Sequence, residues 1–341
     1  MCHKMQRKGR QTVFLKHPVT ILETAAIVGK KEGEGPLSDS FDRILEDDCF
    51  GEASWEKAET KLQREAILSA IKKAGLKPEH IDYAFSGDLL NQCIGAEYAM
   101  RELSIPFFGL YGACSTMTEG LTLAALVING GTADYITAST SSHFCAAEKQ
   151  YRLPLEYGGQ RTPSAQWTVT GAGCAVLARE PGRVQITHLT TGRVVDFGVT
   201  DANNMGAAMA PAAADTLKAH FRESGFSPSD YDLILTGDLG EIGSDLLCDI
   251  MNQEGYDIYT QHQDCGLLIF DRKRQDVHAG GSGCGCCASV FCGHVFPAIF
   301  RGEYRRILVM ATGALMNPQI VLQGESIPGI AHAVTIERKD G

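Results

Sequence analysis

A chain of 341 residues with 44% hydrophobic and 21% charged side chains is long enough for two domains or one large α/β unit. Its 31 basic and 41 acidic residues give a formal net charge of −10, which argues against nucleic acid as a partner because phosphate binding needs a positive surface. Twelve cysteines without a secretory signal indicate a reducing compartment and free thiols. We find no apolar run of about 18–20 residues, so we expect neither a signal peptide nor a transmembrane segment.

The N-terminal part of the chain alternates between strand and helix patterns. Residues 12–15 and 19–28 have the apolar character of strands, and His17-Pro18 separates them. The glycine-rich, charged residues 29–38 predict an exposed loop. Apolar side chains recur at spacings of three and four between residues 52 and 74, which predicts a helix that ends at Gly75.

The same order of elements recurs about 150 residues later. Gly75, Pro78, Asp82, Gly87, Asp88 and Leu89 match Gly225, Pro228, Asp232, Gly237, Asp238 and Leu239 at a constant offset. A period of this length is too long for a solenoid of short repeats. We therefore predict an internal duplication of a β/α half, with residues 1–180 and 181–341 forming one compact unit of helix-covered sheets.

Residues 109–120 predict a strand-to-helix turn with a cysteine at its centre. An aromatic, strand-like approach leads into Gly112 and Cys114, and the apolar residues 121–128 follow at helical length. A thiol at the start of a helix lies at the positive end of the helix dipole, which favours the thiolate. Cys114 is therefore a candidate nucleophile or ligand contact. The alternative, which these residues leave open, is a small buried thiol that fills a tight turn.

Several motifs resemble the stage V sporulation protein AD family, a branch of the thiolase and ketoacyl-synthase superfamily. They are GACSTM at 112–117, TSSH at 140–143, AEKQYR at 147–152, EYG at 156–158, AQWTVTGAG at 165–173 and DVHAGGSGCGC at 276–286. The resemblance covers nearly the whole chain, and the last two motifs are specific. It implies a thiolase-like fold with five layers, α-β-α-β-α, built from two duplicated halves.

The resemblance also implies a binding protein rather than a catalyst. Members of this family act in the uptake of dipicolinic acid, with its calcium, into the developing endospore and in its release at germination. They are implied to lie at the spore inner membrane, as peripheral proteins beside membrane proteins of the same operon. The superfamily further implies a homodimer that pairs the strand after the cysteine turn, here residues 135–139, and the resemblance implies no cofactor.

The second half lacks the groups that activate the cysteine in superfamily enzymes. The position of a Gly-His-Pro motif is occupied by Gly280-Gly281-Ser282, and residues 312–316 contain no cysteine. The second-half strand ends in Gly237-Asp238, where ketoacyl synthases of the third type would carry a histidine. Loss of an activating base typically removes about 10²–10⁴-fold in rate. We expect a non-catalytic protein in which Cys114 is a vestigial nucleophile; the alternative is an acyl-transferring or condensing enzyme that uses it.

A flat dianion such as dipicolinate requires cations or N–H donors at both ends and an apolar slot for its ring. Residues 143–173 combine cations with aromatic side chains in an otherwise acidic chain. We therefore predict a ligand site near the cysteine turn. Its predicted members are Cys114, His143, Lys149, Arg152, Trp167 and Thr170, with Lys149 or Arg152 pairing a carboxylate.

Two further sets of residues receive structural interpretations. Cys284, Cys286, Cys287 and Cys292 lie in the second glycine-rich turn and the helix after it, without the paired Cys-x-x-Cys spacing of a zinc site. We predict that they pack between the two halves, so no metal site is expected. Asp88 and Asp238 are equivalent in the repeat and are predicted to be structural turn residues.

Overall fold

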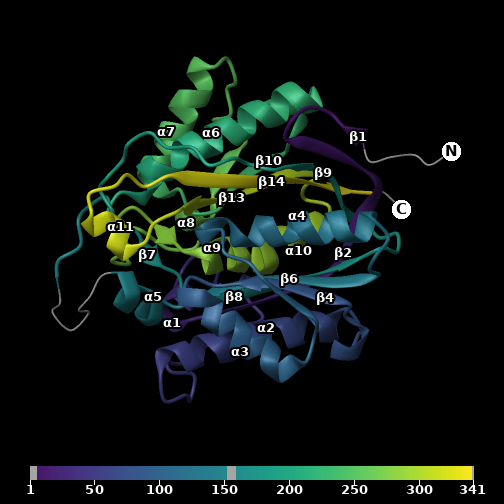
Figure 1. Ribbon diagram of the computed structural model, residues 1–341, viewed down its shortest axis with the longest axis horizontal. Coiled ribbons are helices and arrows are strands. Elements are labelled where there is room, and N and C mark those ends of the chain that lie inside the picture. The colour runs from purple at the N-terminus through teal and green to yellow at the C-terminus, as the bar shows by residue number, and fades with distance from the viewer. Residues whose placement is uncertain (1–5, 152–158, 340–341) are drawn as a thin grey trace.

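A computed structural model describes residues 6–151 and 159–339 of the chain (Figure 1). The strands are β1 (Gln6–Arg7), β2 (Thr12–Val28), β3 (Arg43–Ile44), β4 (Tyr83–Gly87), β5 (Phe107–Gly109), β6 (Tyr135–Ser142), β7 (Trp167–Thr168), β8 (Gly171–Ala178), β9 (Val184–Thr190), β10 (Leu233–Thr236), β11 (His262–Asp264), β12 (Gly281–Ser282), β13 (Arg306–Ala314) and β14 (Gly329–Arg338). The helices are α1 (Lys30–Gly33), α2 (Trp55–Lys73), α3 (Ile94–Leu103), α4 (Thr116–Asn129), α5 (Phe144–Tyr151), α6 (Met205–Ser224), α7 (Gly240–Gln253), α8 (Cys265–Leu268), α9 (Cys284–Val290), α10 (Phe296–Arg301) and α11 (Pro318–Leu322).

These elements form five layers. Helices α6 and α7 cover the outer face of a sheet that contains β10, β13, β14 and β9 (Figure 1). Helices α4, α9 and α10 lie between this sheet and a second one that contains β2, β8, β6 and β4, and α2 and α3 cover the outer face of the second sheet. The predicted α-β-α-β-α fold is therefore confirmed.

The order of the strands has an internal symmetry. Hydrogen bonds connect them as β11-β10-β13-β14-β9-β2-β8-β6-β4-β5, so β5-β4-β6-β8-β2 on one side mirrors β11-β10-β13-β14-β9 on the other. The two sets meet where β2 pairs with β9. The first set lies within residues 12–178 and the second within residues 184–338, so the duplication in the sequence has a counterpart in the topology.

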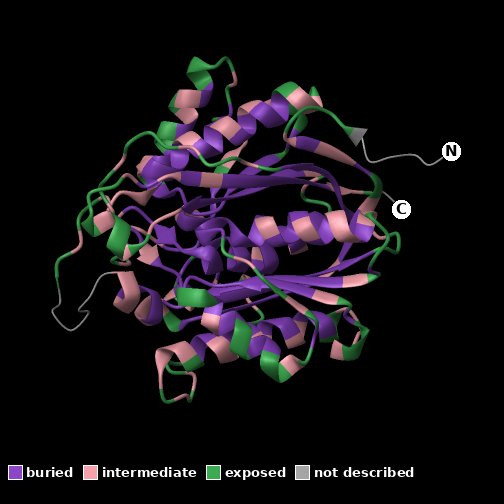
Figure 2. Ribbon diagram, in the orientation of Figure 1, coloured by how far each residue is buried: buried purple, intermediate pink, exposed green. Residues whose placement is uncertain are grey.

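The largest core lies between the two sheets. Buried residues fill both sheets and much of the middle helix layer, whereas the outer helices expose one face (Figure 2). The continuous helical stretch Cys284–Arg301 runs through α9, a π-helical turn and α10, and by length and composition it could cross a membrane. The expectation that the chain has no apolar stretch of this length is therefore wrong. Because 78% of the Cys284–Arg301 stretch is buried within the described structure, we interpret it as a core helix.

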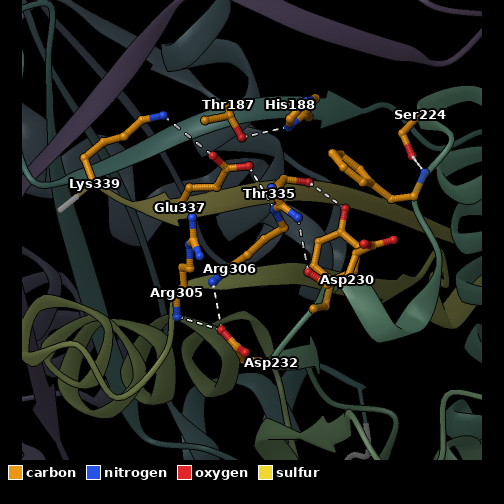
Figure 3. Close-up of polar contacts among 12 residues, drawn as sticks. Thr187, His188, Ser224, Asp230, Asp232, Arg305, Arg306, Thr335, Glu337 and Lys339 are labelled. Atoms are coloured by element: carbon orange, nitrogen blue, oxygen red, sulfur yellow. Dashed lines mark hydrogen bonds and ion pairs between the residues drawn. The ribbon is translucent and has the colours of Figure 1, made fainter.

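Equivalent contacts order the corresponding turns of the two halves in the same way. Gly75 and Gly225 both adopt left-handed φ angles, of 72° and 80°, after α2 and α6. The Oδ2 atom of Asp82 accepts hydrogen bonds from the backbone N–H groups of residues 134 and 135, at 2.7 and 3.0 Å. Asp232 Oδ2 accepts the equivalent pair from Arg305 and Arg306, at 2.6 and 3.0 Å (Figure 3). Each aspartate therefore fixes the start of a neighbouring strand.

Replacing either aspartate should weaken the fold by a similar amount. Asp82→Ala and Asp232→Ala each remove two hydrogen bonds at an exposed position, so we expect each to lower the free energy of unfolding by about 1 kcal/mol. Urea denaturation measures this loss, with Glu79→Ala, an exposed acid in the turn before Asp82, as the control. An unchanged midpoint in either variant would contradict the equivalent role of the two turns.

Two predictions for the N-terminal region were wrong in part. Residues 12–28 form the single strand β2 rather than two strands, and a register shift against β9 between Phe14 and Val19 accommodates Pro18. Residues 30–33 form the short helix α1 within the predicted exposed loop, and Glu32 is fully buried. A hydrogen bond from the Thr170 N–H to the Glu32 carboxyl group draws this segment inward.

The prediction that residues 135–139 pair with a second copy across a dimer axis is also wrong. Strand β6 is hydrogen-bonded to β4 on one side and to β8 on the other, so neither of its edges is free for a second copy. The end of the sheet in the first half is β5, at the far end of the strand order. The sequence misled here because the strand after the cysteine turn is an interior strand of the sheet.

Candidate functional site

The cysteine turn connects β5 to α4 through a strained backbone. Ala113 has a φ of 50°, which is unusual for a residue with a side chain. A single turn of 3₁₀-helix, Ala113–Ser115, then leads into α4, so Cys114 stands just before the first turn of that helix. Gly313 of β13 packs against this turn so closely that a Cβ atom there would lie 2.3 Å from the carbonyl oxygen of Gly112. The second half of the chain therefore holds the turn in place.

Cys114 lines a cavity of about 220 Å³ to which both halves contribute. The lining residues are Leu89, Tyr111, Ala113, Cys114, Ala147, Glu148, Tyr151, Thr168, Ala202, Asn203, Met205, Ser282, Ala314 and Met316. Helix α5 supplies one wall, and the segments before α6 and after β13 supply another. Mostly apolar walls with a few polar groups are typical of a small-molecule binding site.

Asp238 lies beside the Cys114 thiol, within hydrogen-bonding reach of it. Burial raises the pKa of Cys114 well above its usual value, and the negative charge of Asp238 raises it further. The expectation of a stabilised thiolate at this helix start is therefore wrong, because desolvation and a neighbouring carboxylate favour the protonated thiol.

Three hydrogen bonds hold the carboxylate of Asp238. Its Oδ2 atom accepts hydrogen bonds from the Ser282 hydroxyl at 3.1 Å and the Gly283 N–H at 2.9 Å, and its Oδ1 atom accepts one from the Thr312 hydroxyl at 3.2 Å. Burial raises the pKa of Asp238 to about 6. The prediction that Asp238 is only a structural turn residue was incomplete, because its charge also raises the pKa of Cys114. Asp88 does order a turn, because it accepts hydrogen bonds from the N–H groups of residues 90 and 96.

The remaining polar groups of the cavity are linked in pairs. The hydroxyls of Tyr111 and Tyr151 are 2.7 Å apart, and Tyr151 also donates to the Leu89 carbonyl at 2.8 Å. The Thr168 hydroxyl donates to Glu148 at 3.0 Å. Within the described part of the chain, the lining residues include no lysine, arginine or histidine. A ligand in this cavity therefore meets aromatic rings, hydroxyls and an amide rather than a formal positive charge.

The family of the chain follows from two comparisons. Residues 9–337 match the family model described as stage V sporulation protein AD (SpoVAD). The chain is also 46% identical over 337 residues to the stage V sporulation protein AD of Bacillus subtilis (strain 168), with 99% of both chains covered. The chain belongs to the SpoVAD family.

Solved structures place the fold of this SpoVAD family member among the thiolase-like enzymes. It resembles 3-oxoacyl-[acyl-carrier-protein] synthase III from Aquifex aeolicus VF5 with a TM-score of 0.57, 14% identity, and coverage of 94% of this chain and 99% of that one. It resembles the human mitochondrial 3-ketoacyl-CoA thiolase in complex with CoA with a TM-score of 0.59 and 13% identity, over 96% of this chain and 99% of that one. It resembles a variant of OleA from Xanthomonas campestris with a TM-score of 0.61 and 15% identity, over 95% of this chain and 99% of that one. At these identities the likeness shows the fold alone.

Of the residues predicted to bind ligand in this SpoVAD family member, Cys114 lines the cavity and His143 lies behind its wall. The His143 Nε2–H donates to the Asp48 carbonyl at 2.7 Å, and its Nδ1 accepts from the Ala146 N–H at 3.5 Å. Burial lowers the pKa of His143, so the ring is neutral. Both ring nitrogens are therefore occupied in positioning the start of α5.

Lys149 and Trp167 are not among the residues that line the cavity. Lys149 pairs with Glu56 at 2.5 Å and lines a separate surface hollow. Trp167 stacks on Phe144 with 3.7 Å between ring centroids, and the Lys31 ammonium lies 3.6 Å from the Trp167 centroid. Arg152 lies outside the described residues. Selection by charge favoured Lys149, whereas its helix neighbours Ala147, Glu148 and Tyr151 line the cavity.

Thr170, the last predicted contact, links two elements behind the site. Its hydroxyl accepts a hydrogen bond from the Phe144 N–H at 3.0 Å, at the start of α5. Its own N–H donates to Glu32 Oε1 at 3.0 Å. Burial raises the pKa of Glu32 to about 8, so this carboxyl group is protonated at neutral pH. Thr170 and Glu32 therefore support the cavity wall from outside.

Glu32 should make stability depend on pH. The pKa of Glu32 in the folded state, about 8, exceeds the ordinary value of 4.5. Its contribution to the free energy of unfolding is therefore complete below pH 4.5 and is lost as the pH rises through 8. The wild type should therefore lose about 4 kcal/mol of its free energy of unfolding between pH 5 and pH 8.5, relative to Glu32→Gln, which has no proton to lose. Urea denaturation at both pH values measures this difference, and a constant difference would contradict a buried neutral Glu32.

Proposed function

We propose that this SpoVAD family member binds dipicolinic acid, with or without calcium, and acts in its uptake into the developing endospore and its release at germination. The observation that carries this proposal is a cavity at Cys114 whose thiol is held protonated, in a chain of this family. The cavity has the features of a binding site, and the cysteine lacks the features of a nucleophile.

The cavity walls suit a flat ring with two carboxylates. Leu89, Met205 and the two tyrosines provide apolar and aromatic surface for the ring. Asn203, Ser282 and the N-terminal end of α4 provide donors and positive partial charge for the carboxylates.

The same geometry disfavours catalysis. An acyl transfer at Cys114 requires a thiolate and a base that generates it. The carboxylate of Asp238 lies beside the thiol, and no histidine is among the lining residues in the described part of the chain. We therefore propose a binding protein that has kept the cysteine turn of a condensing enzyme without its activating groups.

Calorimetric titration of the purified protein with dipicolinate tests this function. We expect saturable heat for the wild type and affinity lowered by about tenfold in Cys114→Ala, which changes the cavity wall, or in His143→Ala, which releases the start of α5. Cys248→Ala, at a half-buried thiol outside the lining set, is the matched control. No saturable heat for the wild type would refute the function, and unchanged affinity in both site variants would refute the location.

The alternative is an acyl-transferring enzyme that uses Cys114, which the shared fold of the synthase and thiolase relatives favours. Incubation with acyl-CoA followed by mass analysis distinguishes the two functions. We expect no acyl adduct on Cys114 and no release of free CoA above that of Cys114→Ala. A covalent adduct with turnover would establish the enzyme instead.

We also propose that the protein works at the spore inner membrane as a homodimer, beside membrane proteins of the same operon. The edge strand β5 is the element of the first half that a second copy could extend, and its Phe108 is 52% exposed. Sedimentation of the wild type and of Phe108→Asp tests this: a dimer that the variant dissociates supports pairing at β5, and a wild-type monomer contradicts the homodimer.

A further inference from the structure

The residues that line the Cys114 cavity differ in how far they are exposed to solvent. Cys114 and Ala147 are buried, whereas Tyr111 is 46% exposed. Partial exposure is shared by five other lining residues, which are Tyr151, Ala202, Asn203, Met205 and Met316. A ligand enters past the exposed part of the wall, so these residues mark the mouth of the cavity. Within the described part of the chain, Tyr111 is the most exposed residue of the lining.

Tyr111 and Tyr151 come to the mouth from different elements and are bonded to each other. Tyr111 lies between β5 and the cysteine turn, and Tyr151 is the last residue of α5. Their hydroxyl oxygens are 2.7 Å apart. This hydrogen bond therefore joins the segment before the cysteine turn to the cavity wall that α5 provides.

The single proton of each phenol fixes the direction of this bond. Tyr151 donates its proton to the Leu89 carbonyl at 2.8 Å. Tyr151 can then only accept in its bond with Tyr111, so the Tyr111 hydroxyl is the donor. Tyr151 also packs against the buried cluster that contains Leu89 and Cys114. It is therefore the anchored partner of the pair, and Tyr111 is the exposed one.

We propose that Tyr111 is the gate of the cavity, held across the mouth by its hydrogen bond to Tyr151, and that it sets the size of the molecules that pass. This inference deepens the proposed function and rests on it only for the identity of the ligand. Exposed side chains change rotamer within nanoseconds, and one hydrogen bond of ordinary strength shifts an equilibrium about fivefold. Small molecules pass the closed gate, whereas a ring-sized ligand passes only when the Tyr111 ring has turned outward.

Two thiol reagents of different size test the gate, because Cys114 lies beyond the mouth. Methyl and benzyl methanethiosulfonate share one reacting group and differ in the group that they transfer, and the benzyl group has a six-membered ring like that of dipicolinate. A change in the pKa of Cys114 alters both rates alike, so the ratio of the two rates reports passage through the mouth. Mass analysis of the Cys114 peptide gives both rates, with the exposed Cys49 as an internal control.

Tyr111→Phe removes the hydrogen bond and keeps the ring. We expect the benzyl reagent to label Cys114 about fivefold faster in this variant than in the wild type, and at least as fast in Tyr111→Ala, which removes the ring. The methyl reagent should label Cys114 equally in the wild type and Tyr111→Phe. The matched control is Tyr98→Phe, at a 44% exposed tyrosine on α3 outside the lining set, which should leave both rates unchanged.

Three results would overturn the gate. The first is a benzyl rate that is unchanged in Tyr111→Phe, and the second is an equal acceleration of the two reagents. The third is a failure of both reagents to label Cys114 in Tyr111→Ala, which would show that this mouth does not lead to the thiol. Urea denaturation of each variant confirms that the rates belong to folded protein.

Stopped-flow mixing with dipicolinate separates the gate from the proposed function. A gate that opens equally in the free and the occupied protein changes the association and dissociation rate constants by the same factor and leaves Kd unchanged. We expect both constants to rise about fivefold in Tyr111→Phe. A weaker Kd with an unchanged association rate would make Tyr111 a wall contact instead of a gate. A wild type that does not bind dipicolinate would refute the proposed function, and the thiol rates would still decide for or against the gate.

Discussion

Alkylation of Cys114 at pH 7.5 should become at least about tenfold faster when Asp238 is replaced by asparagine. The carboxylate of Asp238 lies against the thiol and disfavours its ionisation, and a neutral amide removes that charge while keeping a similar shape. Because the thiolate is the reacting form, a lower pKa increases its population and therefore the rate of alkylation. Burial continues to raise the pKa in the variant, so its Cys114 should still react more slowly than an exposed thiol.

Timed iodoacetamide labelling with mass analysis of the Cys114 peptide measures this change. The exposed Cys49 provides an internal control in the same digest, and its rate should be equal in both proteins. The rate for Cys114 should also depend on pH in both. An equal Cys114 rate in the wild type and Asp238→Asn would contradict the conclusion that Asp238 keeps the thiol protonated.

Gly173→Ala should cause a large loss of stability. Gly173 lies in β8 of the first half, and a Cβ atom there would lie 2.3 Å from the carbonyl oxygen and 2.5 Å from the carbonyl carbon of Ala288, in α9 of the second half. Neither backbone can move freely because both are buried in the main core. We expect the free energy of unfolding to fall by about 3 kcal/mol or more, at the upper end of the cost of overpacking.

Urea denaturation of Gly173→Ala and of a matched substitution measures this loss. Gly159→Ala is the control, since a Cβ atom at Gly159 would meet no atom of the described residues within 4 Å. The control should unfold within about 0.5 kcal/mol of the wild type. A Gly173→Ala protein as stable as the control would contradict the close contact between β8 and α9 on which the assembly of the two halves depends.

The sequence was sufficient to predict the layered fold because the duplication leaves local marks. Gly75 and Gly225 adopt the left-handed conformation that only glycine takes readily, and Asp82 and Asp232 bind paired N–H groups at strand starts. These requirements are local, so they appear at a constant offset. The dimer strand was mispredicted because the pairing of β6 with both β4 and β8 depends on segments far apart in the chain.

The site was less predictable because its side chains meet only after folding. Cys114 could be predicted from the sequence of its turn. Asp238 comes from the other half of the chain, and the one feature of the sequence that could have indicated it is its position at the end of a strand. On α5 the choice of Lys149 followed charge, whereas the direction of each side chain from the helix decides which ones face the cavity. Glu32 was assigned to an exposed loop because nothing in the sequence indicates that Thr170 binds its carboxylate.

Filling the cavity tests the central claim most directly. Ala147 on α5 is buried against Leu89, Cys114 and Tyr151, so Ala147→Phe would place a ring in the space assigned to dipicolinate. The measurement is calorimetric titration of dipicolinate into the wild type and this variant, after urea denaturation has shown that both are folded. We predict saturable binding to the wild type and at least a hundredfold weaker binding to Ala147→Phe. Equal binding to the two proteins, or no binding to the wild type, would contradict a dipicolinate site at Cys114.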